Sequence, residues 1–183
     1  LRRAEHALVE AYSNAGFNGP DRLKKYRILR WAILQHYEIV PTPLLDLTHS
    51  LRIAVSFAAQ ADLDSAYIFA LAVPQVSGAI TASAEEGLQM IRLASVCPPE
   101  AVRPHIQEGY LLGEYPELGD YEQKTLYPRY EIDCAHRLIA KFFFNPEMFQ
   151  KDGNFPIIPP QALYPDEQSD PLRRMSEQIK RVL

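Results

Sequence analysis

The pattern of apolar and polar positions predicts helices in the first part of the chain. Leu8 and Tyr12 share one face of a helix predicted over residues 5–14, and a glycine follows soon after it. A second helix is expected over residues 22–37, with Asp21 as its cap. Its basic face, which is either solvated surface or a phosphate contact, consists of Lys24, Lys25, Arg27 and Arg30.

A polar segment between two apolar stretches, residues 35–59, organises the rest of the chain. Pro41 and Pro43 fix φ and push the residues before them toward extended geometry, so the second helix is expected to end near this point. Ser50 precedes a run with apolar residues at helical spacing, which predicts that it caps a helix. The local prediction is a helix, a tight loop and a helix.

The later pattern mixes strands and helices. Residues 66–73 are a continuous apolar run, which predicts a buried strand. A serine and a glutamate at capping-box spacing predict a helix over residues 84–93. Alternation predicts a strand over residues 103–113, with Gly109 allowing close backbone approach. A proline-initiated amphipathic helix is expected over residues 171–182.

Two stretches connect these elements. Residues 113–128 are polar and turn-rich, and are expected to form a loop. Residues 130–133 and 138–144 fit two strands or a strand and a helix, because periodicity does not separate short apolar runs. The expected fold class is α+β: a single domain over residues 1–183, with a helical N-terminal part packed on a small, mostly antiparallel sheet. The chain begins with Leu1, so we expect it to be a fragment of a longer protein.

Composition narrows the classes of protein. The chain has 183 residues, of which 47% are hydrophobic, enough for one sizeable core. A net charge of −4 disfavours nucleic acid as a partner, and no apolar run is long enough to span a membrane. Cys97 and Cys134 are widely spaced, and the histidines lack metal-ligand spacing, so neither disulfides nor a metal site are expected. The expected localisation is the cytoplasm.

A resemblance to a known family rests on the central segment. It consists of Gln35, His36, Tyr37, Pro41, Thr42, Leu44, Leu45, Asp46, Thr48, Ser50, Ala54, Phe57 and Ala58. This arrangement resembles the core motif of the FRG domain family. Two shorter segments, residues 103–110 and 162–166, resemble later motifs of the family in the same order.

Three positions differ from the family pattern. Glu38 stands where the family usually has glycine, Pro43 where it has arginine, and Leu47 where it has an aromatic residue. The aromatic-Arg-Gly tripeptide that names the family does not occur, so the chain is either a divergent or an N-terminally trimmed member. The missing arginine removes a bidentate anion contact and favours a non-catalytic role.

Candidate chemistry in the central segment has two interpretations. His36, Asp46 and Ser50 could form a catalytic triad, but no nucleophile-elbow motif accompanies them, and such residues more often cap helices. Asp46 is accordingly expected to be mostly buried and to accept backbone hydrogen bonds within its loop. The functional alternative is a cleft lined by uncharged polar groups, which suit a neutral ring such as a nucleobase or a nicotinamide.

The candidate site joins this segment to the later strand. The expected catalytic residues are Gln107, Glu108 and His36, and the expected substrate-binding residues are Gln35, Tyr37, Thr42, Asp46, Thr48, Ser50, Arg103 and Tyr110. Gln107 and Gly109 are expected on one face of the strand, which requires Gln107 within about 12 Å of Thr48 for a shared site. Since adjacent strand residues face opposite sides, only one of Gln107 and Glu108 could serve.

The order of these motifs also resembles that of ADP-ribosyltransferases, at the level of fold analogy. The leading hypothesis is therefore a cleft that binds NAD or a related nucleotide as substrate, with no tightly bound cofactor. The implied reaction is ADP-ribosyl transfer or NAD cleavage in a bacterial defence or toxin protein. The alternative is a non-catalytic module that binds a protein partner.

Overall fold

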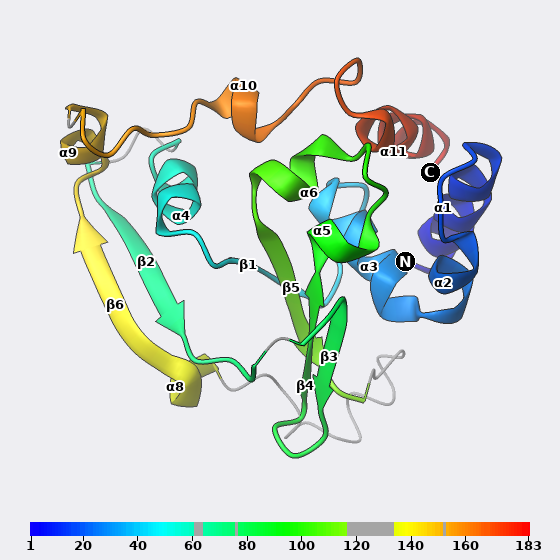
Figure 1. Cartoon of the computed structure of the whole chain (residues 1–183), viewed down its shortest axis with the longest axis horizontal. Coiled ribbons are helices and arrows are strands. Elements are labelled where there is room, and N and C mark those ends of the chain that lie inside the picture. Colours follow the sequence, from blue (N-terminus) through cyan, green and yellow to red (C-terminus); the bar gives the residue numbers. More distant parts are fainter. Residues whose placement is uncertain (61–63, 76, 117–133, 152) are drawn as a thin grey trace.

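The chain combines short helices with antiparallel strands (Figure 1). The structure is a computed structural model and describes residues 1–60, 64–75, 77–116, 134–151 and 153–183. Its helices are α1 (Arg2–Asn14), α2 (Pro20–Lys25), α3 (Arg27–His36), α4 (Leu51–Ala58), α5 (Leu93–Val96), α6 (Val102–Ile106), α8 (Cys134–Arg137), α9 (Pro146–Lys151), α10 (Pro160–Leu163) and α11 (Pro171–Val182). Its strands are β1 (Leu45–Thr48), β2 (Ala66–Leu71), β3 (Ile80–Ser83), β4 (Leu88–Arg92), β5 (Gly109–Glu114) and β6 (Leu138–Phe144).

The strands form two separate sheets. One has four strands in the order β1-β5-β4-β3, and the other pairs β2 with β6; every pairing is antiparallel. Figure 1 shows β2 and β6 at one end of the molecule, with α1, α2, α3 and α11 at the other. The predicted α+β class, with helices packed on mostly antiparallel sheet, is confirmed.

The main core lies where the N-terminal helices meet the four-stranded sheet. Leu8 of α1, Ile33 of α3 and Leu172 of α11 are fully buried together with Ile91 of β4 and Leu111 of β5. Burial of large aliphatic side chains stabilises a fold by about 1.5–3 kcal/mol each. The two chain ends are therefore joined: α1 packs on α11, and both helices lie on the same core.

The basic face of the predicted second helix has an internal partner. Glu5, 4% exposed, accepts hydrogen bonds from Arg27 Nε at 3.1 Å, Arg30 Nε at 2.9 Å and Trp31 Nε1 at 3.0 Å. Buried carboxylates require such partners because an unpaired buried charge is costly. Arg27 and Arg30 therefore hold α3 on α1, and do not face a phosphate from this position.

The helix predicted over residues 22–37 is two helices. Tyr26 adopts an extended backbone conformation with φ −106° and ψ 110°, which separates α2 from α3. Arg30 Nη1 donates to the carbonyl oxygens of Leu23 at 2.8 Å and Lys24 at 2.9 Å. This contact satisfies carbonyl groups that a helix end leaves unpaired, so a side chain from α3 stabilises the break.

The helix predicted over residues 84–93 is wrong, because this segment belongs to the β3–β4 hairpin. Ser83 Oγ does accept from the Glu86 N–H at 3.2 Å, as a capping box would, but Gly87 then takes φ +63° and turns the chain back. Pairing of β4 with β5 buries Leu88 and completes the sheet. Tertiary pairing thus outweighs the local helix signal.

The strand predicted over residues 103–113 is correct only in its second half. Residues 102–106 form α6, and β5 begins at Gly109. Gln107 and Glu108 lie in the turn between them, where Glu108 has φ +46°. The premise that Gln107 and Gly109 share a strand face is therefore wrong.

The strand predicted over residues 66–73 is present as β2, but it is not fully buried. Its partner β6 settles the ambiguity at residues 138–144 in favour of a strand, while residues 130–133 lie outside the described residues. Tyr67 and Phe69 are 50% and 55% exposed, and within the described residues no third strand pairs with β2 or β6. The loop predicted over residues 113–128 also lies mostly outside the described residues.

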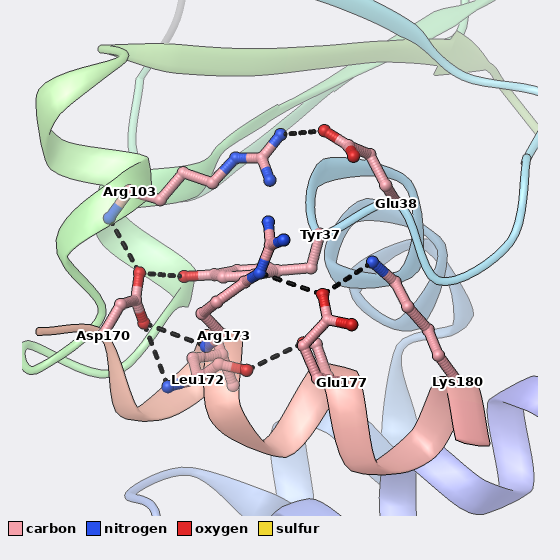
Figure 2. A network of polar contacts seen from close by, with 9 residues as sticks. Tyr37, Glu38, Arg103, Asp170, Leu172, Arg173, Glu177 and Lys180 are labelled. Carbon is pink, nitrogen blue, oxygen red and sulfur yellow. Dashed lines mark hydrogen bonds and ion pairs between the residues drawn. The ribbon is translucent and has the colours of Figure 1, made fainter. Parts of the chain in front are cut away.

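A buried carboxylate joins the C-terminal helix to the central segment (Figure 2). Asp170, 0% exposed, caps α11 by accepting from the N–H groups of Leu172 at 3.0 Å and Arg173 at 3.1 Å. Its second oxygen accepts hydrogen bonds from the Tyr37 hydroxyl at 3.0 Å and from the backbone N–H of Arg103 at 2.9 Å. Three segments far apart in the sequence therefore depend on one side chain.

We predict that Asp170→Asn lowers the free energy of unfolding by ~3 kcal/mol, because the amide loses one accepting oxygen and leaves buried donors unpaired. Chemical denaturation measures the change. Asp166→Asn is the matched control: Asp166 also accepts two backbone hydrogen bonds, from Gln168 and Ser169, but on the exposed surface. Equal, small effects of both substitutions would contradict the role of Asp170.

Candidate functional site

An open cleft of about 950 Å³ lies between the two sheets. Its lining comes from β1 and Gly109 on one side and from β2 and Leu138 on the other, with α4 contributing three small or aromatic residues. Four consecutive residues of the edge strand β1, residues 45–48, border it. Ligand pockets in proteins commonly have volumes of about 300–1,000 Å³, so this cleft can hold a dinucleotide-sized molecule.

Six of the eleven predicted site residues line the cleft: Gln35, His36, Asp46, Thr48, Arg103 and Gln107. The remaining five, Tyr37, Thr42, Ser50, Glu108 and Tyr110, are not part of its lining. The lining residues come from α3, β1 and the α6 region, which the sequence separates by up to about seventy positions. The structure therefore gathers the two predicted segments at one place.

The expected proximity of Thr48 and Gln107 is confirmed. Thr48 Oγ1 donates to the carbonyl oxygen of Gln107 at 3.1 Å. The Gln107 side chain, however, is buried, and its Nε2 donates to the Leu163 carbonyl oxygen at 2.7 Å. The contact therefore arises from the turn before β5, and the Gln107 amide fixes α10 at the edge of the cleft.

Gln35 organises the loop beside the cleft. Its Oε1 accepts from the Thr42 N–H at 2.8 Å and from the Thr42 hydroxyl at 3.2 Å. Its Nε2 donates to Asp46 Oδ2 at 2.9 Å. One side chain thus holds the proline-containing loop and positions a carboxylate, while Thr42 itself contacts the loop and not the cleft.

Asp46 is exposed, so the expectation that it is mostly buried and accepts backbone hydrogen bonds is wrong. Its backbone belongs to β1, opposite Leu111 of β5, and its side chain borders the open cleft. The backbone N–H of Thr42 donates to Gln35 Oε1 and not to Asp46. Although solvent reaches the Asp46 side chain, the surrounding protein removes part of its hydration, which raises the pKa of the carboxyl, and the hydrogen bond from Gln35 lowers it.

His36 is neutral at the end of α3. It is 4% exposed, and its Nε2 has no hydrogen-bond partner. Desolvation and, secondarily, the charge of Arg103 lower the pKa of His36 to about 3. A Cβ on Gly109 would lie 3.4 Å from His36 Cε1 and 2.9 Å from Leu93 Cδ1, so the close approach at Gly109 serves packing. A neutral imidazole can accept or donate a hydrogen bond, but cannot supply a proton at neutral pH.

Arg103 is the buried cation of the site. Its side chain is 5% exposed, and its Nη2 donates to Glu38 Oε1 at 2.6 Å, as Figure 2 shows. Nε and Nη1 have no partner. The guanidinium lies 4.7 Å from the ring centroid of Tyr164 and 5.7 Å from that of Tyr37, which holds it between two aromatic rings.

Two residues outside the predicted site complete this arrangement. Glu38 has φ +56°, a left-handed conformation that glycine adopts most readily, and Glu38 is one of the positions that differ from the pattern of the resemblance. It brings a carboxylate to the cleft, opposite Arg103. Tyr164 lies in the 162–166 segment that resembles a family motif, and this was the only signal that could have indicated it.

The other predicted residues have structural contacts. Glu108 Oε2 lies 2.7 Å from His49 Nε2, and the His49 ring packs edge-on against Tyr110 at 5.4 Å. Ser50 caps α4 by accepting from the Ile53 N–H at 3.4 Å, as predicted. The Tyr37 hydroxyl binds the Asp170 network. A triad of His36, Asp46 and Ser50 is therefore not supported, because Ser50 does not line the cleft.

Within the part of the chain that the structure describes, no three His, Cys, Asp or Glu side chains gather closely enough to hold a metal ion. No described helix combines the length and the apolar character that crossing a membrane requires.

Comparison with known proteins gives one match. A family model described as FRG domain matches residues 2–66, from α1 to the start of β2. Searches of curated proteins and of solved structures returned no match. The matched region includes the central segment with Gln35, Asp46 and Thr48, while Arg103 and Tyr164 lie beyond it.

The low pKa of His36 predicts a pH dependence of stability. Between the usual pKa of about 6.5 and the folded-state value of about 3, the unfolded chain binds a proton that the folded chain does not, so stability falls as pH falls. Going from pH 7 to pH 5 is expected to cost ~2 kcal/mol through this group.

Chemical denaturation at the two pH values measures the effect, and His36→Gln is expected to reduce the difference. The same exchange at His6, which is exposed on α1, is the control. A pH dependence that is identical in the wild type and His36→Gln would contradict the burial of a neutral imidazole.

Proposed function

We propose that the chain is a member of the FRG domain family, whose model matches residues 2–66, and that its cleft binds NAD or a related nucleotide. The observation that carries this proposal is the guanidinium of Arg103, which is buried at the cleft with Nε and Nη1 unpaired.

Unpaired donors at Arg103 favour a ligand with an oxygen acceptor. Leaving a buried polar group without a partner costs about 1–3 kcal/mol, and more when the group is charged. A carbonyl or carboxamide oxygen placed at Nε or Nη1 would recover that cost. Tyr164 stacks against the guanidinium and restricts its orientation. Nε and Nη1 are shielded from solvent, so a ligand oxygen reaches them only when a neighbouring side chain moves aside.

The charges around Arg103 favour a neutral or cationic ring over a phosphate at this end of the cleft. Glu38 already pairs with the guanidinium, and Asp46 adds a second carboxylate to the lining. Two carboxylates repel a phosphate but attract a positively charged ring. The nicotinamide of NAD carries a positive charge and a carboxamide, so it satisfies both the carboxylates and the free donors.

The reaction that we propose is cleavage of the bond between nicotinamide and ribose. Nicotinamide leaves with the bonding electron pair, and water or an acceptor nucleophile attacks the ribose carbon and releases a proton. Asp46 is the carboxylate best placed to stabilise the developing positive charge, because it borders the open cleft and is oriented by Gln35. A bacterial defence or toxin protein is the setting that we propose for this NAD cleavage or ADP-ribosyl transfer.

Neither Gln107 nor Glu108 supports this chemistry in its present contacts. The Gln107 amide nitrogen binds Leu163, and Glu108 pairs with His49 outside the cleft lining. His36 is a neutral hydrogen-bonding group at the base of the site. Our proposal therefore assigns the carboxylate role to Asp46 and the positioning of the carboxamide to Arg103.

A second candidate function is a module that binds a protein partner. The observation in its favour is the apolar surface of β6, where Ile139, Phe142 and Phe143 are 71%, 53% and 65% exposed. Exposed aromatic clusters often mark interaction sites. This candidate predicts no response to nucleotides.

Thermal unfolding with and without ligand tests the proposal. NAD at about 100 times its dissociation constant is expected to stabilise the wild type by ~2.7 kcal/mol through mass action, and nicotinamide should be released on incubation. Arg103→Lys should weaken the stabilisation, because a lysine cannot reproduce the planar donor pair. Arg92→Lys, an exposed site on β4, is the control.

Asp46→Asn separates binding from folding, since Asp46 is exposed and the substitution leaves β1 intact. It is expected to abolish nicotinamide release while the protein melts near the wild-type temperature. An unchanged melting temperature of the wild type with NAD, ADP-ribose and ATP at millimolar concentration would contradict the proposal and favour the interaction module.

A further inference from the structure

Glu38 is the ion-pair partner of the buried guanidinium at the cleft. Its Oε1 lies 2.6 Å from Arg103 Nη2, and both residues line the cleft. The two side chains differ in their access to solvent, because that of Glu38 is 56% exposed and that of Arg103 is 5% exposed. The pair therefore presents its negative member to solvent and keeps its positive member inside the protein.

The backbone at Glu38 is one that glycine adopts more readily than glutamate. Glu38 and Glu108 are the non-glycine residues with positive φ among those that the structure describes, at +56° and +46°. A Cβ disfavours this region of backbone conformation. The N–H of Glu38 donates to the Gln35 carbonyl oxygen at 2.9 Å, in the turn that ends α3. What this position gains from a carboxylate is its contact with Arg103.

The position of Glu38 on the guanidinium affects which ligands Arg103 can bind. A guanidinium binds a carboxylate or phosphate best through two parallel hydrogen bonds. Two edges of the planar group offer such a donor pair: Nε with Nη2, and Nη1 with Nη2. Nη2 belongs to both edges and is the nitrogen that binds Glu38, whereas Nε and Nη1 have no partner. A second anion at either edge would lie beside the Glu38 carboxylate, but a neutral oxygen needs only one donor.

We propose that Glu38 is a specificity-determining residue: it lets Arg103 bind a neutral carbonyl oxygen and excludes a carboxylate. For a pyridine dinucleotide, this means that the cleft selects the carboxamide over the corresponding acid. Like charges placed side by side repel each other, and more strongly where water is excluded. Asp46, which also lines the cleft, adds repulsion in the same direction. This inference rests on the proposed function and names the chemical group that the cleft distinguishes.

Two dinucleotides that differ at one group test the proposal. NAD carries a carboxamide on its pyridine ring, and nicotinic acid adenine dinucleotide carries a carboxylate at the same position. Isothermal titration calorimetry of the whole chain measures both dissociation constants, and their ratio is compared between variants. The wild type should bind NAD about tenfold more tightly than the acid. Glu38→Gln should reduce this preference to about twofold or less, because the ligand carboxylate no longer meets a neighbouring charge.

A second variant and a matched control separate the charge of Glu38 from its place in the fold. Glu38→Gly removes the carboxylate and puts the favoured residue at φ +56°, so it should fold and lose the preference as Glu38→Gln does. The control is Glu108→Gln. Glu108 also has positive φ, and its carboxylate lies 2.7 Å from His49 Nε2, but it is not part of the cleft lining. This variant should keep the wild-type preference for NAD.

The outcomes separate the two claims. If the wild type binds NAD but does not prefer it to the acid, the role of Glu38 is wrong and the proposed function stands. The same conclusion follows if Glu38→Gln weakens both dinucleotides equally and keeps their ratio, because Glu38 then only holds Arg103 in place. If the wild type binds neither dinucleotide, both claims are wrong.

Discussion

The carboxylate of Asp170 is the contact on which the geometry of the site depends. Its four hydrogen bonds join the start of α11, the residue that follows α3, and the start of α6. Because it binds the backbone of Arg103 and the side chain of Tyr37, it fixes both the guanidinium and one of the rings that flank it. A buried carboxylate that makes four hydrogen bonds restricts the positions of its four donors as well as stabilising them.

The cleft follows from how the two sheets are built. β1 and β2 each pair on one side only in the described residues, so the space between them is bordered by strand edges and not filled by a further strand. Gln35 keeps the loop before β1 in place, and the turn at Gln107 closes the base through Thr48. The result is a polar wall facing an apolar one.

Local signals in the sequence predicted the elements whose ends are set by their own residues. Ser50 caps α4 and Pro171 begins α11 because these contacts lie within a few positions. The helix predicted over residues 84–93 is wrong because the hydrogen bond that Ser83 accepts stabilises a turn and does not begin a helix. Pairing with β5 then makes the following residues a strand. No pattern within residues 84–93 predicts that pairing, because the partner strand lies about twenty positions further along the chain.

The structure brings part of the predicted site residues together, and several of their contacts differ from those expected. Thr48 and Gln107 do meet, although through a turn and not through a strand face. The roles of Glu38 and Tyr164 could not be predicted, because both depend on the position of Arg103, which tertiary contacts determine. Asp46 was expected in the interior, but the loop N–H of Thr42 donates to the Gln35 side chain and not to Asp46.

The most direct test of the central claim observes the Arg103 side chain itself. In a ¹⁵N-labelled sample, the Nε–H signal of Arg103 can be assigned by its loss in Arg103→Lys and followed during addition of NAD. A new hydrogen bond from Nε or Nη1 to the ligand predicts a clear shift of this signal, while that of exposed Arg92 stays in place. A signal that does not move at saturating NAD would show that the unpaired donors do not receive the ligand, and would contradict the account.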